Sequence, residues 1–177
     1  QTLRAHGWDR EIKKTKNTFN FVNQGFNLRP LEVSAAIGLN QLKRLKLMIS
    51  VRKKNRDNII KAIKASPKWK GQYSFFEGNK YLKPSWFSLP LLINDKFLSK
   101  KNIFLKYLKN KNVETRPIIS GNFVNQPCIE LHKIKFNKKE LKNSEEIEKR
   151  GFFIGLPTKP LKNTAVQTLA NILLDLN

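Results

Sequence analysis

The feature that most constrains this chain is a helical pattern that runs from Pro30 to about Ala65. Its apolar residues recur at alternating steps of four and three and so share one helical face: Leu31, Ala35, Gly38, Leu42, Leu45 and Ile49. Ser66-Pro67 ends the pattern. A helix of about 35 residues is long for a globular domain. We interpret it as a bent or broken helix packed on a sheet. A coiled coil is disfavoured by Gly38 and by the brevity of the heptad pattern.

Beyond this helix the chain alternates between strand and helix patterns. The expected strands are Trp86–Ile93, Val113–Ile119 and Phe152–Leu156. The expected helices are Ser99–Lys109, a short helix from Ser144 to Arg150, and Leu161–Leu176. Pro90 suggests an edge or a bulge in the first strand, and Ser144 suggests a helix cap. The order predicts an α/β fold, with a small three-stranded sheet covered by helices.

The net charge of +22 raises the question of a polyanionic partner. Lysines number 27 and arginines only 8, whereas nucleic-acid binders favour arginine for bidentate contacts. We therefore expect a basic surface without nucleic-acid binding. The segment closest to a nucleic-acid pattern mixes aromatic and basic residues: Trp69, Tyr73, Phe75, Phe76 and Tyr81 beside Lys68, Lys70, Lys80 and Lys83.

Two other totals concern the setting of the protein. No apolar run approaches the roughly 18 residues of a membrane span, so no membrane partner is expected. The single cysteine, Cys128, excludes an internal disulfide and a zinc site built on several thiolates. We expect a reducing, cytoplasmic location. The chain begins with Gln1, so we also expect it to start inside a longer protein.

Familiar catalytic motifs are absent. The only histidines, His6 and His132, fit no motif such as HExxH, and the chain has neither a GxSxG motif nor a Walker-type loop. Cys128 and His132 are four residues apart, but no acid that would orient the histidine is evident. Two segments carry more chemistry. Asn27 and Arg29 lie just before the long helix, where an anion would meet free N–H groups. Arg116 leads from a strand into a turn that contains Asn122. The alternatives are a capped helix with a surface arginine, and an ordinary strand and turn.

The segment Gly25–Leu45, GFNLRPLEVSAAIGLNQLKRL, resembles the signature of the DegT/DnrJ/StrS family. Shorter resemblances follow in order along the chain: Leu3–Trp8, Glu114–Pro117, Gly121–Phe123, Gln126-Pro127 and Gly151–Pro157. The family contains pyridoxal-phosphate (PLP) enzymes of aspartate-aminotransferase fold that act on nucleotide-linked keto sugars. The resemblance implies the C-terminal part of such a fold type I enzyme. Residues 1–29 would end the large cofactor domain, 30–66 would form the connecting helix, and 67–177 the small domain.

The resemblance also implies site residues. Asn27 would contact the PLP phosphate of the neighbouring subunit in a homodimer, with Arg29 near the same shared site. Arg116 and Asn122 would lie near the nucleotide sugar. The family's Schiff-base lysine matches no position here and would lie upstream of residue 1, so we expect the isolated chain to lack catalytic activity.

Three functions stay open at this stage. The first is a sugar aminotransferase of surface-polysaccharide and deoxyamino-sugar biosynthesis, with an amino-acid donor such as glutamate. The second is a sugar 3-dehydratase of the same family, in which histidine replaces the lysine. The third, of another class, is a basic nucleic-acid-binding module.

Overall fold

The chain forms two compact units, Gln1–Lys46 and Leu47–Asn177, which are described separately. The computed structural model describes residues 2–9, 21–28, 30–79 and 81–176. None of the helices in these ranges is both long and apolar enough to cross a bilayer.

In the first unit, two extended segments pair through their backbones. After a short 3-10 helix, η1 (Thr2–Arg4), Ala5 forms an antiparallel bridge with Asn27. The His6 N–H donates to the Phe26 carbonyl at 3.1 Å, and the Leu28 N–H donates to the Arg4 carbonyl at 2.9 Å. The signature segment is therefore held as an extended strand before it enters the long helix.

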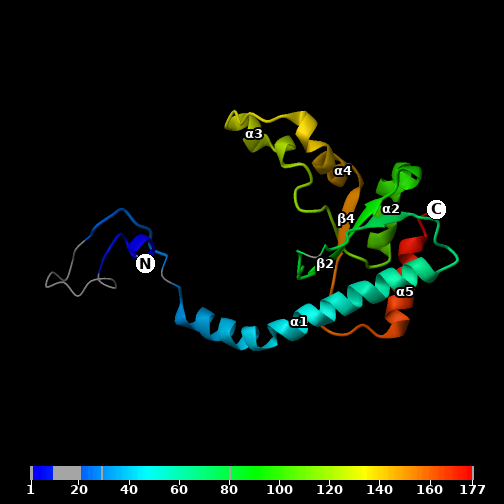
Figure 1. Cartoon of the computed structure of the whole chain (residues 1–177), viewed down its shortest axis with the longest axis horizontal. Coiled ribbons are helices and arrows are strands. Elements are labelled where there is room, and N and C mark those ends of the chain that lie inside the picture. The colour runs from blue at the N-terminus through cyan, green and yellow to red at the C-terminus, as the bar shows by residue number, and fades with distance from the viewer. Residues whose placement is uncertain (1, 10–20, 29, 80, 177) are drawn as a thin grey trace. The chain divides into compact units, whose positions relative to one another are not determined.

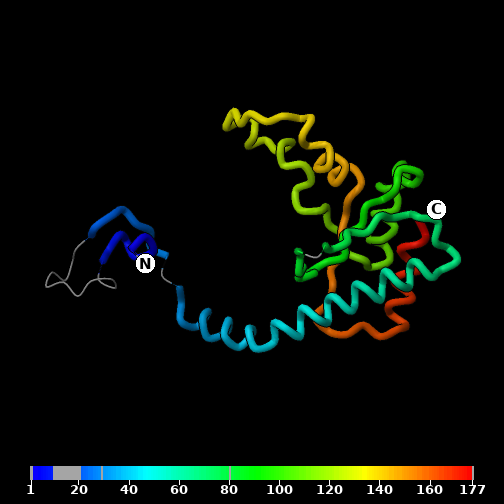
Figure 2. The backbone as a smooth tube through the Cα atoms, in the orientation of Figure 1, coloured from blue at the N-terminus to red at the C-terminus, as the bar shows by residue number. Residues whose placement is uncertain are grey.

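The long helix, α1, is continuous from Glu32 to Ala65 (Figures 1 and 2). This confirms one helix over the predicted range and excludes a break within it. Its buried residues all lie in the C-terminal half: Asn55, Ile59, Ala62 and Ile63. The predicted apolar face of the N-terminal half is largely exposed in this chain, with Leu31 71% and Leu42 61% exposed.

The second unit contains an antiparallel sheet of four strands, in the order β1-β2-β4-β3. The strands are β1 (Tyr73–Phe75), β2 (Ser88–Ile93), β3 (Thr115–Arg116) and β4 (Gly151–Gly155). The prediction of three strands was wrong, because β1 is too short for its alternation to be read from sequence. Pro90 is tolerated within the inner strand β2, since the pairing with β1 begins only at Leu91.

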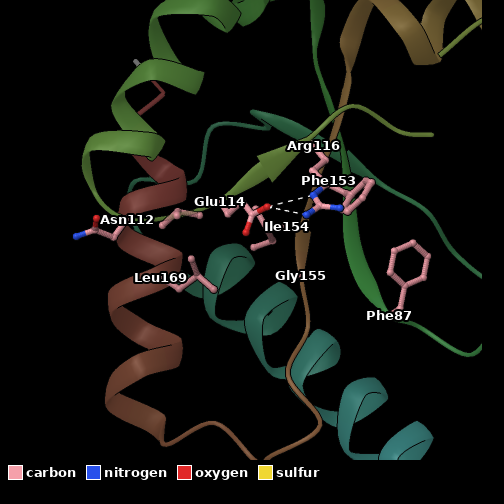
Figure 3. Close-up of a pocket in the computed structure, with 9 residues that line it drawn as sticks. Phe87, Asn112, Glu114, Arg116, Phe153, Ile154, Gly155 and Leu169 are labelled. Atoms are coloured by element: carbon pink, nitrogen blue, oxygen red, sulfur yellow. Dashed lines mark hydrogen bonds and ion pairs between the residues drawn. The ribbon is translucent and has the colours of Figure 1, made fainter. Parts of the chain in front are cut away.

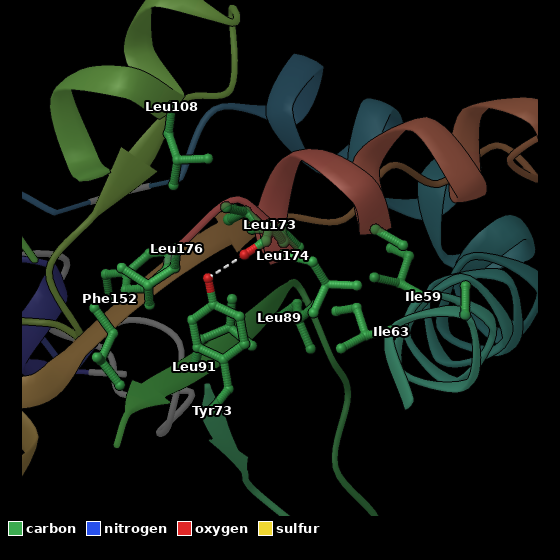
Figure 4. Packing of buried hydrophobic residues seen from close by; sticks show 14 of the residues in the cluster. Ile59, Ile63, Tyr73, Leu89, Leu91, Leu108, Phe152, Leu173, Leu174 and Leu176 are labelled. Atoms are coloured by element: carbon green, nitrogen blue, oxygen red, sulfur yellow. Dashed lines mark hydrogen bonds between the residues drawn. The ribbon is translucent and has the colours of Figure 1, made fainter. Parts of the chain in front are cut away.

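Helices cover one face of this sheet and enclose the core. They are the C-terminal half of α1, α2 (Lys101–Asn110) and α5 (Asn163–Leu174). Alternate residues of the inner strands point into this core, and Leu89, Leu91 and Ile93 are fully buried. Figure 4 shows Tyr73 among these apolar side chains, with its hydroxyl donating to the Leu173 carbonyl at 2.5 Å.

Shorter helices complete the second unit: η2 (Asp95–Lys100), η3 (Phe123–Asn125), α3 (Pro127–Leu131), η4 (Lys138–Leu141) and α4 (Lys142–Arg150). The prediction that Ser144 caps the last of these was wrong, because the residue before α4 is Leu141. The preceding 3-10 turn, capped by Asn137, carries the chain directly into α4, so Ser144 lies within the helix.

Buried polar side chains join α1 to the rest of the second unit. The Asn55 amide donates to the carbonyls of Pro157 and Lys159, and its oxygen accepts from the Leu161 N–H. Because Asn55 is 2% exposed, these three bonds fix the β4–α5 connection against the helix.

Candidate functional site

Two glycines determine how the signature segment packs in the first unit. Gly7 has φ +82°, and a Cβ there would lie 1.6 Å from the Asn23 carbonyl oxygen. A Cβ on Gly25 would lie 2.1 Å from the Gly7 backbone nitrogen. Only glycine allows the two backbones to approach so closely. The pairing of Asn27 with Ala5 therefore requires glycine at both positions.

Asn27 lies at the end of this ladder, shortly before α1 begins. Its side chain is exposed and has no hydrogen-bond partner among the described residues. The amide is thus available to donate to a ligand. Arg29, predicted to lie near the same site, falls outside the described residues, and its role stays a prediction.

In the second unit, Arg116 forms an ion pair with Glu114 on the same strand face. Its Nε and Nη2 atoms both donate to Oε1 of Glu114, at 3.1 and 2.9 Å. The side chains of Arg116 and Glu114 are 68% and 77% exposed, so the pair adds little to stability. It places the guanidinium beside the carboxylate, so that the hollow presents both charges together.

This pair lines an open hollow of about 480 Å³. The other lining residues come from four segments of the second unit: Phe87, Asn112, Val113, Phe153, Ile154, Gly155 and Leu169. In Figure 3, Arg116, Glu114 and Phe153 lie together between Asn112 and Phe87. The rings of Phe87 and Phe153 meet edge to face, with centroids 5.6 Å apart.

The sheet explains why these groups gather. Arg116 and Phe153 are register partners on β3 and β4, so their side chains lie on the sheet face that the core helices leave open. The hollow combines a cation, a carboxylate and an aromatic wall. A guanidinium binds phosphate or hydroxyl oxygens, a carboxylate accepts from hydroxyl or ring N–H groups, and aromatic rings pack against apolar faces.

Asn122 lies elsewhere. It is 2% exposed, its side chain is not among the groups that line the hollow, and its backbone N–H donates to Oε2 of Glu148 at 3.1 Å. Its Nδ2 atom is buried without a hydrogen-bond partner. The structure therefore does not bring Asn122 to Arg116 in this conformation.

Other candidates gain no support from the geometry. Among the residues that the structure describes, no group of three or more histidine, cysteine or carboxylate side chains could hold a metal ion. Cys128 and His132 are linked only by a backbone hydrogen bond at the end of α3. In the aromatic segment considered for nucleic acid, Tyr73 is buried, and the Trp69 and Phe75 rings pack against the core, with centroids 5.8 Å apart.

Sequence reasoning missed Glu114 and Phe87 as members of the hollow. Glu114 was visible as a carboxylate two residues from Arg116, a spacing that puts both on one face of a strand. Phe87 carries no comparable signal, because its approach to Phe153 depends on the pairing of β2 with β4.

Comparisons with known proteins agree with this architecture. The model of the DegT/DnrJ/EryC1/StrS aminotransferase family matches residues 1–173. The chain is 34% identical over 166 residues to a GDP-4-keto-6-deoxy-D-mannose 3-dehydratase of Escherichia coli O55:H7, covering 86% of the chain and 41% of the relative. The same-named protein of Yersinia pseudotuberculosis is 31% identical, with 86% and 40% covered. The chain thus spans about two-fifths of the length of these relatives.

Solved structures show the same fold. The E. coli 3-dehydratase with bound hydrated PLP is 29% identical, with a TM-score of 0.74 over 97% of this chain and 45% of that one. PseC, a Helicobacter pylori aminotransferase of pseudoaminic acid biosynthesis, is 20% identical, with a TM-score of 0.76 over 99% and 44%. The chain therefore has the fold of part of a fold type I PLP enzyme. The chain belongs to the DegT/DnrJ/EryC1/StrS aminotransferase family.

Proposed function

We propose that the full-length protein is a PLP-dependent nucleotide-sugar 3-dehydratase that acts on a GDP-linked 4-keto-6-deoxy hexose. The observation that carries this proposal is the similarity to the named 3-dehydratases, at 34% and 31% identity. In the structural comparisons, the aminotransferase PseC shares 20% identity with the chain, against 29% for the E. coli 3-dehydratase. This favours the second of the two family functions over the first.

Asn27 fits the cofactor's phosphate. Its amide is exposed and free, and the ladder with Ala5 holds its backbone. We place it against the phosphate of the neighbouring subunit in a homodimer, with Arg29 close by. When bound, the cofactor would supply an electron sink for the reaction at the sugar. Asn27 itself would only bind the cofactor and would take no part in moving protons at the sugar.

The hollow fits the substrate. Arg116, oriented by Glu114, would donate to phosphate or hydroxyl oxygens of the nucleotide sugar. The free oxygen of Glu114 would accept from a hydroxyl or a ring N–H group. Phe87 and Phe153 would cover an apolar face and exclude water on that side.

The domain division follows from this assignment. We place residues 1–29 at the end of the cofactor domain, 30–66 in the connecting helix and 67–177 in the small domain. A sugar aminotransferase remains the second candidate, because PseC matches the fold over 99% of the chain.

The deciding experiment supplies the full-length protein with PLP, glutamate and a GDP-linked 4-keto-6-deoxy hexose. A 3-dehydratase yields a sugar that has lost the 3-hydroxyl group and keeps the 4-keto group, which NMR shows directly. A 4-amino sugar would establish the aminotransferase instead. Glu114→Gln keeps the size of the side chain but removes the charge that pairs with Arg116. KM should therefore rise about tenfold with little change in kcat.

A further inference from the structure

The turn that links β3 to α3, residues 117–126, contains backbone strain next to Arg116. Ile119 has φ +52°, a region that β-branched side chains almost never occupy. Its side chain is 76% exposed, so burial of the side chain does not compensate for the strain. Gly121 follows with φ +67°, where glycine is tolerated. Strain of this kind persists only where neighbouring contacts enforce it.

A second unfavourable feature lies three residues along the same turn. Asn122 is 2% exposed, yet its Nδ2 atom has no hydrogen-bond acceptor. Buried donors are nearly always paired in folded proteins. The turn therefore keeps both a strained backbone and an unsatisfied donor within four residues, and both would be relieved by a different conformation.

Glu148 on α4 holds the turn in this conformation. Its Oε2 atom accepts from the Asn122 N–H at 3.1 Å and from Nδ2 of Asn125 at 2.7 Å. The stem of its side chain packs so closely on Gly121 that a Cβ there would lie 2.7 Å from Cγ. One side chain thus contacts three residues of the turn.

Glu148 is itself anchored within the second unit. Nζ of Lys101, on α2, donates to the carbonyls of Glu148 and Lys149, at 3.2 and 2.8 Å. Helix α4 then leads directly into β4, whose Phe153 is the register partner of Arg116. The turn is therefore connected to the hollow by two routes. One is the chain itself, through β3, and the other is the contact with Glu148 on α4, which leads into β4.

We propose that this turn is a latch for the substrate hollow, that Glu148 is the positioning residue that closes it, and that substrate binding opens it. In the open turn Ile119 leaves the left-handed region, and the Asn122 amide donates to an oxygen of the nucleotide sugar. The ligand opens the turn because it binds the open form more tightly. This inference rests on the proposed function, since it takes the nucleotide sugar as the ligand.

Two variants of the full-length protein test the latch, because they should act in opposite directions. Glu148→Ala removes the contacts that hold the turn closed, so it should tighten binding of GDP-mannose, a stable sugar nucleotide, about threefold to tenfold. Ile119→Asn relieves the strain of the closed turn, since asparagine tolerates positive φ. It should therefore weaken binding about tenfold. Hydrogen exchange in residues 119–125 of the free protein should become faster in the first variant and slower in the second.

The controls are matched to each change. Glu145→Ala removes a carboxylate from the same helix without touching the turn, and Ile119→Val keeps the strained β-branched residue. Both should bind GDP-mannose within twofold of the unchanged protein. If Glu148→Ala and Ile119→Asn both weaken binding, or neither changes it, the latch is wrong.

The failure of the latch can be told apart from that of the proposed function. Binding of GDP-mannose does not require turnover. If the protein binds it and responds as expected but yields no dehydrated product, only the proposed reaction fails. If the unchanged protein binds no GDP-sugar, the substrate assignment and the latch fall together.

Discussion

Each of the two compact units is stabilised by its own internal contacts, and these contacts differ in kind. The first unit relies on backbone pairing and on two glycines that allow a close approach, and its described core is small, with Ala5 as the buried apolar residue. The second has a continuous apolar core between one sheet and three helices. Burial of apolar surface is the main favourable term in folding. The second unit therefore has the larger share of stabilising contacts within this chain.

The comparison also separates the two kinds of candidate site. Asn27 sits on a backbone ladder, where its position depends on Gly7 and Gly25. Arg116 sits on the open face of a sheet whose other face is the core. Substitutions that disturb the first site should leave the core intact, whereas those that disturb the core should affect the second site.

The largest expected effect comes from a matched pair of substitutions in one helix. Ile59→Ala empties a fully buried position of α1, which should lower the free energy of unfolding by about 2–5 kcal/mol. Ile37→Ala, in the same helix, removes a side chain that is 59% exposed in this chain, and should change it by less than about 0.5 kcal/mol. Urea unfolding of the chain measures both. A large effect of Ile37→Ala would show that the exposed face of α1 is covered, and would break the contrast between the units.

The next effect is on the polar link between α1 and the β4–α5 connection. Asn55→Ala removes three hydrogen bonds and leaves the Leu161 N–H and the carbonyls of Pro157 and Lys159 without this partner. We expect a loss of about 2–3 kcal/mol, because unsatisfied buried groups carry their full desolvation penalty. Ser50→Ala in the same helix is the control, since its hydroxyl bonds only locally, to Leu47. Equal thermal midpoints for the two variants would contradict the role of Asn55.

A smaller effect, on cofactor binding, is expected from a substitution in the first unit. Gly25→Ala places a Cβ 2.1 Å from the Gly7 nitrogen, so the ladder must separate and Asn27 must move. In the full-length protein we expect PLP retention to weaken about tenfold, or roughly 1.4 kcal/mol, while the core of the second unit keeps its stability. Gly38→Ala is the control, because a Cβ there meets nothing within 4 Å. Unchanged PLP affinity in Gly25→Ala would remove the basis for placing Asn27 at the cofactor.

Much of the fold could be predicted from the sequence, because its signals are local and periodic. The helix from Glu32 to Ala65 follows from a long apolar repeat and a proline stop. The strands β2 and β4 follow from short apolar runs between turns, and β3 lies within the predicted strand Val113–Ile119. The three-residue β1 could not be predicted, since it gains its conformation from pairing with β2.

The candidate site was less accessible to sequence reasoning. Arg116 does line a hollow, and the spacing of Glu114 places it beside Arg116, but Phe87 joins the hollow only through the pairing of β2 with β4. The backbone N–H of Asn122 bonds to Glu148, which lies 26 residues further along the chain. Contacts of this range leave no periodic trace in a single sequence.

The smallest expected effect is a pH dependence at the C-terminal end of the second unit. Burial alone would raise the pKa of Asp175, but the hydrogen bonds from Tyr107, at 2.7 Å, and Lys68, at 2.9 Å, outweigh it and lower the pKa. A carboxylate whose pKa is lowered by folding stabilises the protein above its unfolded pKa, and this contribution is lost as the pH falls through the folded value. Its side chain is 37% exposed, so solvent screening limits the effect to less than about 1 kcal/mol. Asp175→Asn should therefore lower stability slightly at pH 7 and make no difference at about pH 2, as urea unfolding at both pH values would show. An equal loss at both would mean that the carboxylate acts through packing rather than through its charge.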